Sequence, residues 1–141
     1  MKKIAKYDFP AVGCYVDESS GSADDCNRRT IAFAQCYGFK PGRGVWQMGS
    51  EGLSWVGDKA VDFLNELETR SFMAWQFEDN SLFLLADVDG ASEDVGFKSS
   101  KDQDYPADDY RGEWLHVSDH GNATLYVRGE DGKDTEIWSV V

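Results

Sequence analysis

Apolar positions recur at helical spacing in the first half of the chain and at strand spacing in the second. The clearest helix is predicted over 59–68, where one apolar stripe indicates a helix docked on a sheet. The stripe consists of Ala60, Phe63, Leu64 and Leu67. A second helix is predicted over 26–37. Asp24 or Asp25 would cap its start, and Gly38 would end it.

Glycine is frequent between these two helices, over 40–57. No phosphate-binding glycine pattern is present there. We interpret the segment as an extended loop or bent strand, anchored to the core by Trp46, Met48, Leu53 and Trp55. The functional alternative is a loop that lines a ligand.

Strands are predicted at 71–77 and 82–86, joined by a hairpin turn at 78–81, because Asp79 and Asn80 tolerate positive φ. The segment 87–109 is polar and acidic, and we expect a long excursion that is functional or mobile. Three further strands, at 113–118, 123–128 and 134–140, form a predicted meander.

The predicted meander has two unlike sides. Strict alternation puts Leu115, Val117, Leu125, Val127 and Ile137 on an aliphatic side, which the helices would cover. It puts Trp114, His116, Thr124, Tyr126, Trp138 and Val140 on an aromatic side. We expect either the acidic excursion or a partner protein to cover the aromatic side.

Together these elements predict one α+β domain spanning residues 1–141. Its two helices pack on an antiparallel sheet of about five strands, which ends in the three-stranded meander. A chain of 141 residues with 41% hydrophobic residues is long enough for a real core.

Negative charge is concentrated in one part of the sequence. Residues 78–113 contain eleven carboxylates and three cations, a net charge of −8 out of −12 for the whole chain. Such a region repels nucleic acid and membrane phosphates and attracts basic protein surfaces or metal cations. We therefore expect a basic protein surface as partner, and neither direct nucleic-acid binding nor membrane binding.

Signs of catalytic or metal chemistry are weak. The histidines are His116, expected to pack in a strand, and His120, expected in a hairpin turn. From Asp87 onward the spacing of Asp and Gly fails the EF-hand pattern, although adventitious divalent-cation binding stays open. Cys14, Cys26 and Cys36 are an odd number without metal-ligand spacing, so we expect no disulfide, zinc or cofactor.

The C-terminal sequence EWLHVSDHGNATLY at 113–126, followed by EIWSVV at 136–141, resembles the C-terminal hairpin of short uncharacterised accessory proteins of tailed phages. The resemblance covers about the last fifth of the chain. It implies a small accessory protein of a mobile element, in a setting where small acidic proteins often inhibit host nucleic-acid enzymes, sometimes by presenting a phosphate-like charge pattern.

The functional hypothesis is a non-enzymatic acidic protein-binding module, plausible as a phage-encoded, DNA-mimic-like inhibitor of a host defence or nucleic-acid enzyme. Aromatic side chains would anchor the interface and carboxylates would steer association. The predicted partner-binding residues are Asp87, Asp89, Glu93, Asp94, Asp102, Asp104, Asp108, Asp109, Trp114, Tyr126 and Trp138.

One alternative is a structural or assembly protein of a phage particle, and the other is a small enzyme that uses His116 or His120. A cytoplasmic location, the host cytoplasm if the chain is phage-encoded, is expected because no secretory signal or apolar span is visible.

Overall fold

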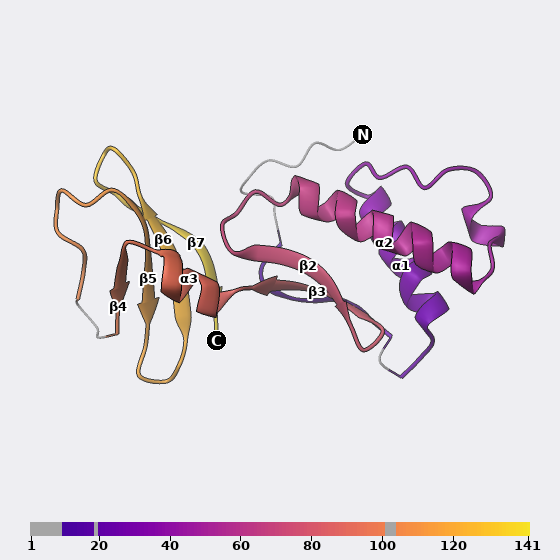
Figure 1. Ribbon diagram of the computed structural model, residues 1–141, viewed down its shortest axis with the longest axis horizontal. Coiled ribbons are helices and arrows are strands. Elements are labelled where there is room, and N and C mark those ends of the chain that lie inside the picture. Colours follow the sequence, from indigo (N-terminus) through magenta and orange to yellow (C-terminus); the bar gives the residue numbers. More distant parts are fainter. Residues whose placement is uncertain (1–9, 19, 101–103) are drawn as a thin grey trace. The chain divides into compact units, whose positions relative to one another are not determined.

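A computed structural model of the chain describes residues 10–18, 20–100 and 104–141 (Figure 1). It confirms the α+β class, with three α-helices and seven strands in the described residues. The strands form two sheets, one of three and one of four strands, instead of the single sheet expected. The contacts divide the chain into two compact units. Unit 1 comprises 1–69 and 73–85, and unit 2 comprises 70–72 and 86–141.

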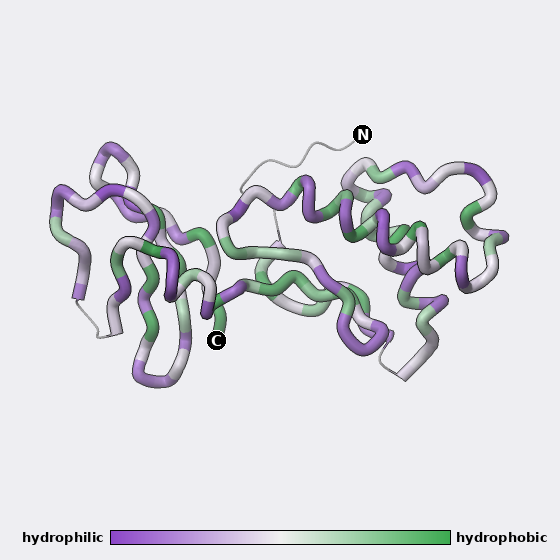
Figure 2. The backbone as a smooth tube through the Cα atoms, in the orientation of Figure 1, coloured by the Kyte–Doolittle hydropathy of each residue, from purple (hydrophilic) through white to green (hydrophobic). Residues whose placement is uncertain are grey.

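Unit 1 places two helices on the sheet β1-β3-β2 (Figure 1). Its elements are β1 (Gly13–Asp17), α1 (Ala23–Gln35), the short 3-10 helix η2 (Val45–Gln47), α2 (Ser50–Leu67), β2 (Met73–Glu78) and β3 (Ser81–Ala86). β3 is the central strand, and its residues are almost continuously hydrophobic (Figure 2), which is typical of a strand inside a core. The predicted β2–β3 hairpin is confirmed, with φ of 48° at Asp79 and 55° at Asn80.

Helix α1 begins three residues before the predicted start. Its cap is Ser22, whose Oγ accepts from the Asp25 backbone N–H at 3.1 Å, so neither aspartate is the cap. Asp24 and Asp25 instead lie in the first turn, where carboxylates suit the helix dipole. The predicted stop is confirmed, because Gly38 has a φ of 105° just beyond the helix.

Helix α2 corrects the prediction for 40–57. It begins at Ser50, nine residues before the predicted start, and runs through Gly52 and Gly57. Gly57 is needed because α1 passes close by. A Cβ at this position would lie 2.1 Å from Oδ1 of the buried Asn27. The glycine that suggested a loop therefore marks a close contact between two helices.

Unit 2 is built on the sheet β4-β5-β6-β7. Its elements are α3 (Val88–Asp94), β4 (Phe97–Ser99), β5 (Gly112–Val117), β6 (Ala123–Arg128) and β7 (Asp134–Val140). The meander β5-β6-β7 is antiparallel, as predicted, while β4 pairs parallel to β5. The segment 87–109, expected to be an excursion, thus contributes a helix and an edge strand to the fold.

A β-bulge in β7 changes the faces of the meander. Leu125 pairs with Trp138 and Tyr126 with Glu136, so Ile137 is an extra residue between two pairs. A one-residue slip moves every following side chain to the other face. Trp138 therefore lies on the face of Leu125, and the predicted aromatic-side placement of Trp138 and Val140 is wrong.

Candidate protein-interaction surface

The aromatic face of the unit 2 sheet is covered by the chain's own segment 104–110. Trp114 stacks on Tyr126 with ring centroids 4.6 Å apart, and the Tyr105 ring meets Trp114 edge-on at 6.1 Å. Pro106 is buried in the same segment. Of the two covers considered from the sequence, the acidic segment is the one observed.

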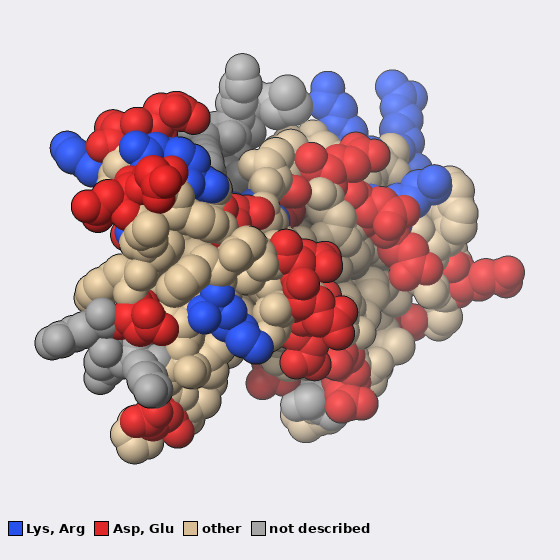
Figure 3. All heavy atoms as spheres, turned by 60° about the vertical axis from the view of Figure 1, so that its left-hand side comes forward, with Lys and Arg blue, Asp and Glu red and all other residues tan. Residues whose placement is uncertain are grey.

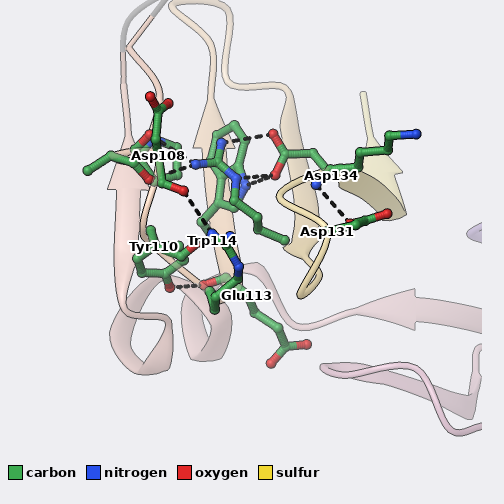
Figure 4. A network of polar contacts seen from close by, with 11 residues as sticks. Asp108, Tyr110, Glu113, Trp114, Asp131 and Asp134 are labelled. Carbon is green, nitrogen blue, oxygen red and sulfur yellow. Dashed lines mark hydrogen bonds and ion pairs between the residues drawn. The ribbon is translucent and has the colours of Figure 1, made fainter.

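A buried arginine, Arg128, fastens this segment to the sheet beside Trp114 and Asp134, which Figure 4 labels. The Arg128 Nη1 donates to the carbonyl oxygens of Pro106 and Ala107, at 3.1 and 2.8 Å. Its Nε and Nη2 donate to the two carboxylate oxygens of Asp134, at 2.9 and 3.0 Å. Asp134 also accepts from the Trp114 indole at 3.0 Å. The backbone of the acidic segment is therefore held by Arg128, which a bidentate ion pair with Asp134 keeps in place.

The electrostatics agree with this geometry. The hydrogen bonds from Arg128 lower the pKa of Asp134, and the Trp114 indole adds to the effect. The same carboxylate raises the pKa of Arg128 above its ordinary value. Both groups are therefore held in their charged forms.

The far end of the segment is tied to the start of β5. The Tyr110 hydroxyl donates to the Glu113 carbonyl oxygen, and its ring lies 6.3 Å from the Phe97 ring. The Arg111 Nη1 donates to the carbonyl oxygens of Asp108 and Tyr110, both at 2.8 Å (Figure 4). The three hydrogen bonds are accepted by main-chain carbonyl groups, so they restrain the backbone and leave the carboxylates of the segment unpaired.

Three of the predicted carboxylates lie on this fixed segment. Asp104, Asp108 and Asp109 are exposed, and none forms a side-chain hydrogen bond or ion pair with any residue that the structure describes. Tyr105 between them is 63% exposed. The segment thus presents three exposed carboxylates and a tyrosine on a restrained backbone. We call these four residues the acidic loop.

Other predicted carboxylates lie on α3. Asp87 caps the helix, with Oδ1 accepting from the Gly90 N–H at 2.9 Å, so its role is structural at least in part. Asp89, Glu93 and Asp94 are exposed. Asp102 lies outside the described residues.

The α3 carboxylates and the acidic loop lie on opposite sides of the sheet. Lys98 shares its face with Leu115, its partner in the register, and its Nζ donates to Ser92 of α3 at 2.9 Å. The acidic loop lies against Trp114, which points to the other face because side chains alternate along a strand. The acidic sequence 87–109 is therefore not one continuous surface.

Two of the three predicted aromatic anchors are interior residues. Trp114 and Trp138 are 2% and 3% exposed, and the Trp138 indole donates to the Ser71 carbonyl oxygen at 2.8 Å. Tyr126 is partly buried, and burial, followed by the nearby Glu136, raises its pKa. The acidic loop lies over Trp114, and the β7 bulge turns Trp138 to the face of Leu125. Tyr105 is the exposed aromatic ring that remains in this part of unit 2.

The histidines lie apart in β5 and in the turn that follows it. The His116 Nδ1 is 3.2 Å from Oγ of the buried Ser99, and His120 is exposed in the β5–β6 turn. An open pocket of about 300 Å³ in unit 1 contains neither histidine. Its walls are formed by Cys14, Asp17, Glu78, Asp79, Ser81 and Phe83.

Neither a metal-binding cluster nor a membrane-spanning helix is found in the described part of the chain. It contains no group of three or more His, Cys, Asp or Glu side chains that could hold a metal ion. None of its helices is long and apolar enough to cross a membrane. Cys14 and Cys36 are exposed free thiols and Cys26 is a buried one.

Sequence reasoning misplaced two tryptophans. Trp46 and Trp55 were expected to anchor a loop to the core, but they are 42% and 62% exposed. Trp55 follows the true start of α2 by five residues, and helical spacing from Ser50 turns it away from the buried Leu53 and Val56. Extending the helical period backwards from Ala60 would have revealed this.

Comparisons with known proteins found no similarity. No protein-family model, curated protein or solved structure matches the chain.

Proposed function

We propose that this chain is an acidic protein-binding module whose acidic loop covers a basic, nucleic-acid-binding surface of another protein. The observation that carries the proposal is the restraint of the loop by Arg128, while Asp104, Asp108 and Asp109 are exposed and unpaired within the described structure. A restrained loop loses little conformational entropy on binding. Carboxylates at the surface accelerate encounter with a basic partner and set its orientation.

Tyr105 supplies the apolar part of the proposed contact. Tyrosine combines a rigid ring with a hydroxyl, and it is enriched among residues that dominate binding energy. It lies between the loop carboxylates with 63% of its surface in water. In this proposal the partner's basic groups meet the carboxylates, and its apolar groups meet the ring.

An inhibitory role follows from the same charge pattern. A protein that occupies a basic surface excludes the polyphosphate that would otherwise bind there. We propose that the chain acts as such a DNA-mimic-like inhibitor. The context of a phage accessory protein, drawn from the resemblance of its C-terminal sequence, fits this role.

The test measures release of fluorescent duplex DNA from a panel of basic DNA-binding proteins, histones among them. The wild-type chain should release DNA from at least one panel member without binding DNA itself. The triple variant D104N/D108N/D109N should release it less well. A matched triple on the other side of the sheet, D89N/E93Q/D94N, removes the same charge and should retain more of the activity.

The salt dependence separates a contact from general repulsion. Direct contacts of the loop should persist at about 0.15 M salt, where charges more than about 8 Å apart are largely screened. Equal loss in both triples at this salt would assign the effect to net charge and contradict the loop as the contact surface. Failure of the wild-type chain to release DNA from any panel member would contradict the inhibitory role.

A further inference from the structure

The solvent-facing side of α2 carries a tryptophan where an amphipathic helix normally has polar residues. Six exposed residues lie within an arc of about 100° on the helix, opposite the buried positions Leu53, Ala60 and Leu64. They are Glu51, Trp55, Asp58, Lys59, Asp62 and Glu66, called here the α2 stripe. Trp55 is 62% exposed at its centre.

The Trp55 ring is already occupied by a cation of its own chain. Lys59, one helical turn further on, has its Nζ 4.6 Å from the ring centroid. The face of an indole attracts ammonium and guanidinium groups through its quadrupole. The Lys59 contact therefore shows which kind of group this exposed ring accepts.

The charge around the ring favours the same kind of ligand. Four carboxylates and one lysine give the α2 stripe a net charge of −3. None of the four carboxylates forms a side-chain hydrogen bond or ion pair with a described residue. They are free to pair with a partner's cations.

We propose that the α2 stripe is a docking surface for an arginine-rich segment of a partner protein, with one guanidinium stacked on Trp55. Arginine fits better than lysine because its planar guanidinium stacks on a ring and pairs with carboxylates at the same time. The surface belongs to unit 1 and is distinct from the acidic loop, so it goes beyond the proposed function. A partner bound here displaces Lys59 from the ring or stacks on its other side.

The experiment titrates the ¹⁵N-labelled chain with an oligo-arginine peptide and follows the tryptophan indole N–H resonances, assigned with single Trp variants. The Trp55 resonance should shift, and the Trp46 resonance should not. Trp55→Ala should weaken peptide binding about 5-fold. Trp46→Ala, which removes an exposed ring outside the stripe, should leave it unchanged. An oligo-lysine peptide of equal length should bind more weakly than oligo-arginine.

A gain-of-binding variant makes the test independent of any loss of folding. Lys59→Gln removes the competing cation and makes the stripe more acidic, so it should tighten oligo-arginine binding about 3-fold. Unchanged binding of both Trp55→Ala and Lys59→Gln would overturn the proposal. A stationary Trp55 resonance while other indole resonances move would also overturn it.

The triple variant of the acidic loop distinguishes the two proposals. If D104N/D108N/D109N retains the Trp55 shift, the α2 stripe binds independently of the loop. If that triple abolishes peptide binding and Trp55→Ala has no effect, the acidic loop alone is the basic-partner surface and the present inference is wrong.

Discussion

Arg128 satisfies four acceptor atoms from a position that is 8% exposed. A cation in that environment is tolerated when a carboxylate and further hydrogen bonds replace its lost water. Asp134 supplies the carboxylate, and the carbonyl groups of Pro106 and Ala107 supply the rest. One side chain of strand β6 thus holds the backbone of the acidic loop against the sheet.

We expect Asp134→Asn to destabilise the protein by about 1–3 kcal/mol, because the variant leaves Arg128 without its charged acceptor and weakens the Trp114 hydrogen bond. Chemical denaturation at neutral pH measures this change. The matched exposed variant Asp131→Asn, in the same β6–β7 turn region, should change stability much less, because the asparagine Oδ1 can still accept from the Lys133 N–H.

The same pair predicts a pH dependence. The folded-state pKa of Asp134 lies below its ordinary value of 3.8, so its stabilisation is fully present above that pH. It is lost as the pH falls from about 4 through the lower, folded-state pKa. The difference in unfolding free energy between wild type and Asp134→Asn should therefore shrink on acidification. A difference that stays constant down to pH 2 would contradict the ion pair.

At the scale of elements, the contact between α1 and α2 depends on the absence of one side chain. Asn27 of α1 occupies the space that a Cβ of Gly57 would need. Overfilling such a site forces neighbouring groups to shift. The packing of two helices on the unit 1 sheet thus rests on a glycine inside a helix, where glycine by itself is unfavourable.

We expect Gly57→Ala to cost about 1–3 kcal/mol despite the better helix propensity of alanine. Gly52→Ala in the same helix is the control, since its Cβ would meet Cβ and Sδ of Met48 at 3.1 Å, a milder approach than the 2.1 Å at Asn27. It should cost much less or be neutral. Thermal unfolding of both variants measures the loss of stability. An equal loss at the two glycines would show that the Asn27 contact is unimportant.

Sequence patterns predicted those elements whose hydrophobic period is undisturbed. The β2–β3 hairpin and the C-terminal meander were found because turn residues separate regular strands. The start of α2 was missed because Gly52 and Gly57 suggest a loop unless the path of α1 is known. The bulge at Ile137 was missed because strict alternation carries no sign of an inserted residue.

The candidate site was predictable in part. Charge counting found the carboxylates of 104–109 and could not tell that those of α3 face the other way. The link from Arg128 to Pro106 spans 22 residues, and no local pattern encodes it. Tyr105 was missed because the sequence does not show whether a tyrosine among carboxylates is buried or exposed. Its exposure became clear only once the structure showed its segment lying over Trp114.

At the scale of the whole molecule, charge divides unequally between the two units. Acidic side chains, red in Figure 3, are more widespread than basic ones on the face shown there. Unit 2 has fourteen carboxylates and six cations, a net charge of −8, and unit 1 has twelve and eight, a net charge of −4. Unit 2 is also the smaller of the two. Its charge density favours solubility and fast encounter with basic partners, at some cost in self-repulsion.

The prediction of a single domain can be tested through the core of unit 2. Trp114→Ala removes a 2%-exposed ring together with its stacking on Tyr126, and should cost about 3–5 kcal/mol. We expect amide hydrogen exchange to accelerate in β5 and β6, while α1 and α2 keep their protection. Equal acceleration in all elements would instead show that the chain opens as one cooperative domain.

The buried thiol of unit 1 can report how fast helix α1 opens. All three cysteines lie between residues 14 and 36, and Cys26 alone is buried, with its pKa raised chiefly by that burial. The thiolate is the reactive form, so an alkylating reagent should modify Cys14 and Cys36 at once and reach Cys26 when α1 opens. The delay between the two events times the opening of the helical half of the chain, without any introduced label.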